Sequence, residues 1–461
     1  MSAGAHVTHV HGIDQFLDDH AEEHLRELLD LSRIPGVASA TDRGPLERTA
    51  MAIATKFEGM DFAVRVDSTD GGPPVVIASA GPEDSTRHLI CYGHYDVFPV
   101  DGQEGWNTEP FEPVVEGDRL YGRGVADNKG QFLAHMNAFD WWRQQPGGLP
   151  IRVTMILEGE EEVGSPHLPA WIQKHAAELQ GDLCVYSDGP TLAGDAPAVL
   201  FGARGALCLE FTANGLKRPL HSGGFGGTVR NPALRLARLF SDIVAPNGDI
   251  LVPGVEHGVP EPTTEELREL SALPFDVDGF QEQTGQTPLP WEHGENFYVR
   301  QLLKPSFNVS GFASGDAENF RTLVPDTAKA RVDIRLVGDQ DPAHVLSCIR
   351  EFIADRGYEE ISVRELFNQP PSRTPFDARW ATTVMEAMRF GFDRSDISRV
   401  PSLPGTTPDW VFTKLLDLPT YMLPLGPVDE NHHGPNETMR LSLMRAGTRT
   451  MAELVRLLAR S

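Results

Sequence analysis

The sequence predicts an α/β fold, in which a mixed and largely parallel sheet flanked by helices is interrupted by an inserted, smaller α+β domain. Three observations lead to this prediction. Short β-rich runs alternate with amphipathic helical stretches in the first 205 residues, which is typical of parallel strands joined by helices. The pattern changes from about Gly205, and it returns after Pro370 and Pro371.

The first region is expected to contain two helices and then alternating strands and helices. Apolar residues recur at helical spacing in residues 13–32 and 45–57, which predicts two amphipathic helices. The short β-rich runs predict strands over residues 62–66, 74–79, 87–97, 151–157 and 183–187. Helical stretches separate these strands at residues 129–144 and 168–179.

The second region predicts an α+β unit, and the third returns to helices. A strand at 206–213 and a helix at 232–243 precede a long Pro/Gly-rich stretch over 245–303. The second region continues with strands at 307–311, 328–337 and 361–366 and a helix at 343–356. The third region contains helices at 381–390, 410–416 and 441–458. We therefore expect domains at 1–205 and 206–372, with the first domain completed by 373–461, because insertion at a surface loop is well tolerated.

Composition restricts the class of protein. The 461 residues have a formal net charge of −26, which argues against a nucleic-acid partner. No run approaches the ~18 consecutive apolar residues of a membrane span, and residues 1–25 lack the apolar core of a signal peptide, so a cytosolic protein without a membrane partner is expected. The four cysteines stand far apart without a C-x-x-C pair and are predicted to be buried free thiols.

Histidine and acidic residues follow the predicted strands, where an open α/β sheet binds its ligands. His94 and Asp96 stand two apart at one strand end, so their side chains are expected on the same face. Asp96 could then accept a hydrogen bond from the imidazole and fix its tautomer. A surface motif without function is the alternative for this pair taken alone.

Other candidates occupy similar positions, and each has an ordinary alternative. Asp127 lies where a small-residue loop enters a helix, so it could be a helix N-cap. The run Glu160–Glu162 could be a solvated face, and Asp188 could form a turn. His432 and His433 lie in a loop before the last predicted helix.

These carboxylates would repel each other in one crevice, and their pKa values would rise, unless cations lay among them. A pair of divalent ions removes the repulsion. His94, Asp127 and Asp188 could hold one ion. Asp127 would bridge to a second ion that Glu162 and His433 also bind. Three mixed nitrogen and oxygen ligands per ion suit Zn²⁺, with Mn²⁺ or Co²⁺ possible, and such a pair activates water and polarises a carbonyl.

The same residues carry a family resemblance. The motifs span nearly the whole chain, and they are GHYDV (93–97), GRGVADNKG (122–130), EGEEEVGS (158–165), SDG (187–189) and HGPNE (433–437). Their order resembles the dinuclear zinc exopeptidases and amidohydrolases that include carnosinase, cytosolic non-specific dipeptidase, aminoacylase, succinyl-diaminopimelate desuccinylase and bacterial glutamate carboxypeptidase. LHSGGFGG (220–227), FNV (307–309) and RLV (335–337) make the chain most similar to the carnosinase-like dipeptidases.

The resemblance implies roles for residues that spacing alone leaves open. Glu161 corresponds to the general base that activates the metal-bridging water, and Glu162 to a ligand, with Glu160 the competitor for the base. His433 matches the family's histidine four residues before Glu437. His432 is then expected to be structural.

The inserted domain is implied to be a lid that forms a homodimer. There His221 would reach the partner subunit's active site and stabilise the oxyanion. Arg335 and Thr322 resemble binders of the substrate's free carboxylate, and Gly405 and Thr406 resemble a loop that lines the substrate. That loop departs from the family, because residues 402–404 are Ser-Leu-Pro where carnosinase-like members have Arg-Glu-Gly.

The sequence therefore predicts a cytosolic zinc hydrolase that cleaves the peptide or amide bond of a small substrate with a free carboxylate. A dipeptidase is expected first. An N-acyl-amino-acid deacylase or desuccinylase is the alternative, because the altered loop lacks an acid that would bind a free amino group. An inactive binding protein on the same fold is the alternative of another class.

Overall fold

The computed structural model describes residues 10–286 and 296–461, which divide into two compact units. The first unit comprises the chain up to Gly202 together with Thr374–Val400 and Pro408–Ser461. The second unit comprises Ala203–Arg373 and Pro401–Thr407. None of the helices in the two described ranges combines the length and the apolar character that crossing a bilayer requires.

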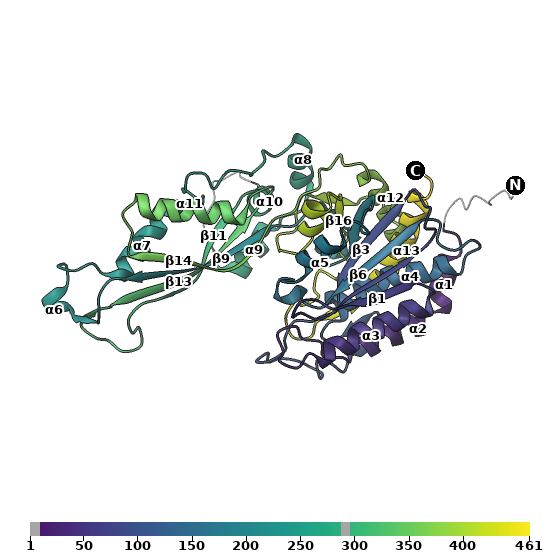
Figure 1. The fold of residues 1–461 in the computed structure, drawn as a ribbon, viewed down its shortest axis with the longest axis horizontal. Coiled ribbons are helices and arrows are strands. Elements are labelled where there is room, and N and C mark those ends of the chain that lie inside the picture. Colours follow the sequence, from purple (N-terminus) through teal and green to yellow (C-terminus); the bar gives the residue numbers. More distant parts are fainter. Residues whose placement is uncertain (1–9, 287–295) are drawn as a thin grey trace. The chain divides into compact units, whose positions relative to one another are not determined.

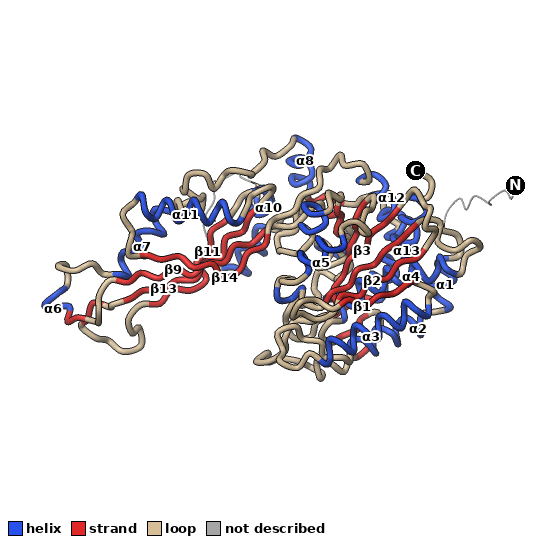
Figure 2. Tube along the Cα trace, viewed as in Figure 1, coloured by secondary structure: helices blue, strands red, loops and turns tan. Residues whose placement is uncertain are grey.

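The first unit is built on a mixed sheet (Figures 1 and 2). In spatial order its strands are β1 (Ala63–Asp67), β2 (Val75–Ala80), β6 (Arg152–Glu158), β3 (His88–His94), β7 (Leu183–Tyr186), β16 (Thr420–Met422), β8 (Ala198–Leu200) and β15 (Ser398–Val400). The central strands β6, β3, β7 and β16 are parallel, whereas β2 pairs antiparallel with β6, and β1 pairs antiparallel with β2. The predicted mixed and largely parallel sheet is confirmed.

Helices and single turns surround this sheet (Figure 1). They are α1 (Ile13–Asp19), α2 (Ala21–Ser32), α3 (Gly44–Gly59), η1 (Val125–Gly130), α4 (Gln131–Arg143), η2 (Glu161–Val163), α5 (Leu168–His175), η3 (Ala193–Asp195), α12 (Ala381–Phe392), η4 (Val411–Leu415) and α13 (Leu441–Leu458). Cys91 of β3 belongs to one apolar core with Ile53 of α3, Phe132 of α4 and Leu454 of α13. The next residue, Tyr92, points to the other face, where its ring centre lies 5.4 Å from that of Phe412 in η4. β3 is therefore buried on both faces, which explains its continuous apolar sequence.

A small separate sheet joins two distant parts of the first unit. Its order is β17 (Thr438–Arg440), β5 (Arg119–Tyr121) and β4 (Val114–Glu116), with Met439 opposite Leu120. The backbone N–H of Gly122 also donates to the carbonyl oxygen of Glu437 at 2.9 Å. This pairing brings the C-terminal histidine loop beside the loop that carries Asp127.

The second unit is an antiparallel sheet with helices on one face (Figure 2). Its strands are β11 (Ser306–Ala313), β13 (Thr327–Leu336), β9 (Gly205–Asn214) and β14 (Ile361–Gln369), beside the pair β10 (Leu220–His221) and β12 (Leu323–Val324). Its helices are α6 (Ser222–Phe225), α7 (Pro232–Ile243), α8 (Thr264–Ala272), α9 (Val277–Thr284), α10 (Phe297–Leu303) and α11 (Pro342–Asp355). Alternate residues of β13, such as Val332 and Ile334, are buried against α7 and α11.

One local prediction was wrong, one alternative is excluded, and one stretch contains helices that were not predicted. The helix expected over residues 13–32 breaks at His20, whose ring Nδ1 lies 2.8 Å from the carbonyl oxygen of Phe16. Asp127 is not an N-cap, because α4 begins only at Gln131 and Asp127 lies within the preceding turn η1. The Pro/Gly-rich stretch over 245–303 contains α8, α9 and α10, and its residues 287–295 lie outside the described part of the chain.

Candidate metal centre

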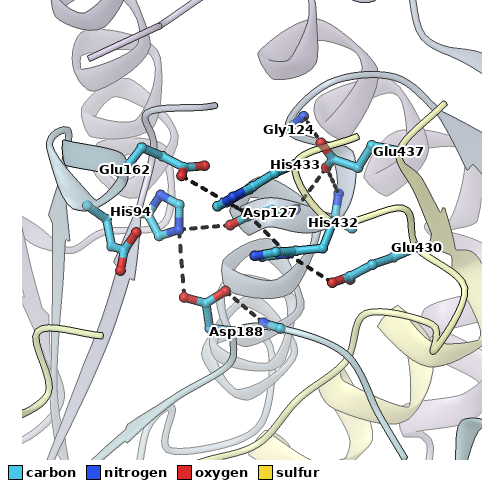
Figure 3. Close-up of polar contacts among 12 residues, drawn as sticks. His94, Gly124, Asp127, Glu162, Asp188, Glu430, His432, His433 and Glu437 are labelled. Carbon is cyan, nitrogen blue, oxygen red and sulfur yellow. Dashed lines mark hydrogen bonds and ion pairs between the residues drawn. The ribbon is translucent and has the colours of Figure 1, made fainter. Parts of the chain in front are cut away.

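Loops at the carboxyl ends of neighbouring parallel strands bring the predicted ligands together (Figure 3). His94 is the last residue of β3, and Asp188 follows the adjacent strand β7. Glu162 lies in η2 after β6, the neighbour of β3 on its other side. Asp127 comes from η1, and His433 from the loop before β17. Parallel strands thus place three of the five side chains at one edge of the sheet.

His94, Asp127 and Asp188 form a buried group. His94 Nε2 lies 3.1 Å from Asp127 Oδ1 and 3.7 Å from Asp188 Oδ2. The three ligand atoms lie within 4.8 Å of one another. One imidazole nitrogen and two carboxylate oxygens at this spacing could hold a divalent cation.

The second oxygen of Asp127 faces a pair of histidines. Asp127 Oδ2 lies 3.2 Å from His433 Nε2, which is 3.0 Å from Glu162 Oε2. His432 is stacked on His433, with its Nδ1 3.5 Å from the same Asp127 oxygen and 3.0 Å from Glu430 Oε1. Asp127, His432 and His433 also bring one ligand atom each within 4.8 Å of one another. The geometry therefore keeps His432 as a competitor of Glu162 for a second cation.

The unsatisfied atoms and the charges at the cluster fit bound cations. Within the described part of the chain, His94 Nε2 and Glu162 Oε1 are buried without a hydrogen-bond partner. Burial, reinforced by the charge of Asp127, raises the pKa of Glu162 to about 10 and also raises the pKa of Asp188. Cations among these groups would give the orphaned atoms partners and remove the electrostatic penalty.

The acidic residues beside the cluster have different partners. Asp96 accepts hydrogen bonds from the backbone N–H groups of Glu161 at 3.2 Å and Glu162 at 3.0 Å. Its backbone oxygen and its Oδ1 each lie 3.2 Å from His94 Nδ1. Because β3 ends at His94, Asp96 reaches this position from the following loop rather than from a shared strand face. Asp96 thus links the orientation of His94 to the turn that carries both glutamates.

Glu160 and Glu161 face different surroundings. Glu160 Oε2 lies 2.7 Å from His167 Nδ1, and Glu160 Oε1 lies 4.0 Å from Arg43 Nη1. Burial raises the pKa of Glu161 well above its usual range, a rise to which Asp188 and Glu162 add and which His94 opposes. Glu161 is thus close enough to the ligands to sense their charge, whereas the Glu160 carboxylate contacts the His167 ring and lies within ion-pair distance of Arg43.

Three buried residues for which the sequence predicted no role in the site support this arrangement. Arg123 and Glu437 are fully buried, with Arg123 Nη1 2.6 Å from Glu437 Oε2. Glu430, also buried, contacts His432. Glu430 could have been noticed from its position two residues before the histidine pair. It was not, because an acidic residue in a Pro/Gly-rich loop is usually solvated.

The remaining predicted site residues all lie in the second unit. His221 Nε2 is 3.5 Å from Thr322 Oγ1. Arg335 Nη1 donates a hydrogen bond to Thr406 Oγ1 at 2.8 Å, and the backbone N–H of Arg204 donates to the carbonyl oxygen of Gly405 at 3.1 Å. The unit thus places four of these five residues in two polar pairs, His221 with Thr322 and Arg335 with Thr406, and the roles of all five stay predictions.

Relatives with known activities resemble the chain over most of their length. A β-Ala-His dipeptidase of Rattus norvegicus is 27% identical over 448 residues, which cover 92% of this chain and 90% of that protein. The Cys-Gly metallodipeptidase DUG1 of Saccharomyces cerevisiae is 28% identical over 394 residues, covering 82% of this chain and 81% of the relative.

Solved structures of similar fold include an M20 family metallo-carboxypeptidase, Sso-CP2, from Sulfolobus solfataricus. It has a TM-score of 0.85 and 27% identity, over 95% of this chain and all of that one. Human carnosine dipeptidase 1 has a TM-score of 0.77 and 25% identity, over 98% of this chain and all of its own. The model of peptidase family M20/M25/M40 matches residues 90–457, from the strand that carries His94 to the last helix. The chain therefore belongs to peptidase family M20/M25/M40.

Proposed function

We propose that this protein is a dinuclear metallodipeptidase, which hydrolyses the peptide bond of small substrates that have a free carboxylate. The observation that carries the proposal is the convergence of His94, Asp127 and Asp188 in one buried group whose second Asp127 oxygen faces His433. The relatives named above are dipeptidases for β-Ala-His and Cys-Gly, which supports a dipeptide as the substrate.

His94, Asp127 and Asp188 would hold one cation, and Asp127, Glu162 and His433 the other. Zn²⁺ is proposed first, because three mixed nitrogen and oxygen ligands suit it, although Mn²⁺ and Co²⁺ accept the same donors. When bound, the pair of cations supplies Lewis-acid polarisation of the scissile carbonyl and acidification of water. Asp96 would keep the His94 imidazole in the tautomer that leaves Nε2 free as a ligand.

Glu161 is proposed as the general base and then the general acid. Its carboxylate takes a proton from the attacking water, and the resulting carboxylic acid gives that proton to the leaving nitrogen as the C–N bond breaks. The two steps need one carboxyl group that reaches both the water and the leaving nitrogen. Glu160 is less suited, since His167 and Arg43 engage its carboxylate.

The inserted domain, residues 206–372, is proposed as the lid and dimerisation domain. Arg335 would bind the free carboxylate of the substrate through its planar guanidinium, with Thr406 and Gly405 in the loop beside it. Thr322, which lies beside His221, is proposed as a second binder of that carboxylate. His221 would donate a hydrogen bond to the oxyanion in the active site of the partner subunit. A homodimer and a cytosolic location are parts of this proposal.

The test is a substrate panel on the metal-loaded protein. Dipeptides with a free amino group, including β-Ala-His and Cys-Gly, are compared with N-acetyl and N-succinyl amino acids. We expect turnover of the free dipeptides. Turnover of the acylated compounds alone would contradict the dipeptidase proposal, and it would fit the Ser-Leu-Pro sequence at residues 402–404.

A further inference from the structure

A buried carboxylate lies directly behind the proposed metal site. Glu437 is fully buried, and its two oxygens accept four hydrogen bonds. Oε1 accepts from the backbone N–H groups of Ala126 at 2.9 Å and Asp127 at 3.0 Å. Oε2 accepts from the backbone N–H of Gly124 at 3.0 Å and from Arg123 at 2.6 Å. Glu437 therefore fixes the backbone of the turn from which Asp127 projects (Figure 3).

The orientation of this turn is critical because Asp127 faces two groups at once. One carboxylate oxygen lies 3.1 Å from His94 Nε2, and the other lies 3.2 Å from His433 Nε2. A rotation of the Asp127 backbone would move both oxygens together. A single displaced turn would thus disturb both proposed cation sites.

Arg123 extends the same contact to the histidine loop. Its Nη2 donates to the carbonyl oxygen of Gly434 at 3.1 Å and to Gln103 Oε1 at 3.0 Å. Gln103 in turn donates to the carbonyl oxygen of His433 at 2.9 Å. The Asp127 turn and the His433 loop, which are more than 300 residues apart in the sequence, are thereby held by one buried ion pair.

We propose that Glu437 is a positioning residue, which acts with Arg123 and Gln103 to set the placement of Asp127 relative to His433 and so determines how tightly the cations bind. The inference rests on the proposed function, since it assumes that these residues are ligands. Groups that orient metal ligands typically change metal affinity 10- to 100-fold when they are replaced.

The decisive variant is Glu437→Gln. Glutamine has the same shape, but either orientation of its amide turns one acceptor oxygen into a donor that faces two other donors. We expect calorimetric titration of the metal-free variant with Zn²⁺ to show about 10- to 100-fold weaker binding than wild type. In the Co²⁺-loaded protein, the visible absorption bands should shift, because they report ligand geometry rather than fold stability.

Glu453→Gln is the matched control. Glu453 is also buried, and its carboxylate accepts a hydrogen bond from Arg456 Nε at 2.7 Å within α13. This control should lower the unfolding midpoint in chelator while it leaves metal affinity and the Co²⁺ spectrum unchanged. A general effect of losing a buried charge would appear in both variants.

Gln103→Ala keeps the inference testable if Glu437→Gln does not fold. Gln103 is half-buried, and its removal affects the His433 loop while it leaves the group of His94, Asp127 and Asp188 intact. We expect one of the two ions to bind more weakly. If wild type binds two ions and both variants bind them as tightly, the inference alone is wrong. If wild type does not bind two ions, the proposed function and the inference fail together.

Discussion

The replacement Glu161→Gln tests the assignment of the general base. Glutamine keeps the size of the side chain and the backbone N–H of residue 161, which donates to Asp96 at 3.2 Å. The turn η2 and the neighbouring Glu162 should therefore stay in place. Only the ability to take up and release a proton at this position is removed.

The size of the effect follows from the number of proton transfers that depend on one group. General acid–base catalysis by a positioned side chain contributes typically 10²- to 10⁴-fold, or about 3 to 5 kcal/mol of barrier. Glu161 is proposed to serve both the attack and the departure step. We therefore expect kcat to fall toward the upper end of that range, with KM changed little, because the substrate binders in the second unit are untouched.

The assay compares Glu161→Gln with Glu160→Gln at equal metal content, measured for each preparation. Glu160 is the matched control, because its carboxylate is held by His167 at 2.7 Å and its loss should affect stability more than chemistry. Near-normal turnover of Glu161→Gln would refute the reasoning. A large loss confined to Glu160→Gln would move the base to Glu160.

Three further predictions test the cations, the acid sensitivity of the fold and the assembly. Metal analysis should give about two divalent ions per chain, and chelation should abolish activity until Zn²⁺, Mn²⁺ or Co²⁺ is returned. Burial, with the charge of Lys56, lowers the pKa of His24 from 6.5 to about 4. The unfolded chain therefore binds a proton more readily below pH 6.5. The free energy of unfolding should fall by up to about 3 kcal/mol between pH 6.5 and 4, relative to that of a His24→Gln variant. The same pH dependence of unfolding in both proteins would contradict this. Heterodimers of His221→Ala and Glu161→Gln subunits should recover activity, whereas verified heterodimers without recovery would argue against a shared active site.

The sequence predicted the parts of the site that depend on the sheet. His94, Asp188 and the glutamate run follow apolar strands, and parallel strands bring their carboxyl ends to one edge. The local pattern of β3, β6 and β7 therefore indicated where these side chains would meet. The short strands β8, β15 and β16 were not predicted, because three residues carry too little periodicity to be distinguished from a loop.

Other features were missed, either because their local signal lies in a Pro/Gly-rich stretch or because they depend on contacts between distant segments. α8 begins with a capping box, in which the Thr263 hydroxyl accepts a hydrogen bond from the backbone N–H of Glu266. This helix was not predicted, because the surrounding sequence is rich in Pro and Gly. The buried pair of Arg123 and Glu437 is formed across 314 residues. Charged residues are usually solvated, so burial of both partners could be recognised only once β17 was seen to pair with β5.

The choice between the two histidines shows where sequence and geometry contribute differently. The spacing from Glu437 favours His433 as the metal ligand, and the structure adds a second difference between His433 and His432. His433 Nε2 contacts both Asp127 and Glu162, at 3.2 and 3.0 Å, whereas His432 lies 3.0 Å from Glu430 and 3.5 Å from Asp127. Glu430 is buried, and its Oε1 lies 3.0 Å from His432 Nδ1, so the imidazole can offset the cost of burying this acid. His432 contacts Glu430 on one side and stacks on His433 on the other, so it can orient His433 without being a ligand itself. Replacement of His433 should therefore weaken cation binding more than replacement of His432.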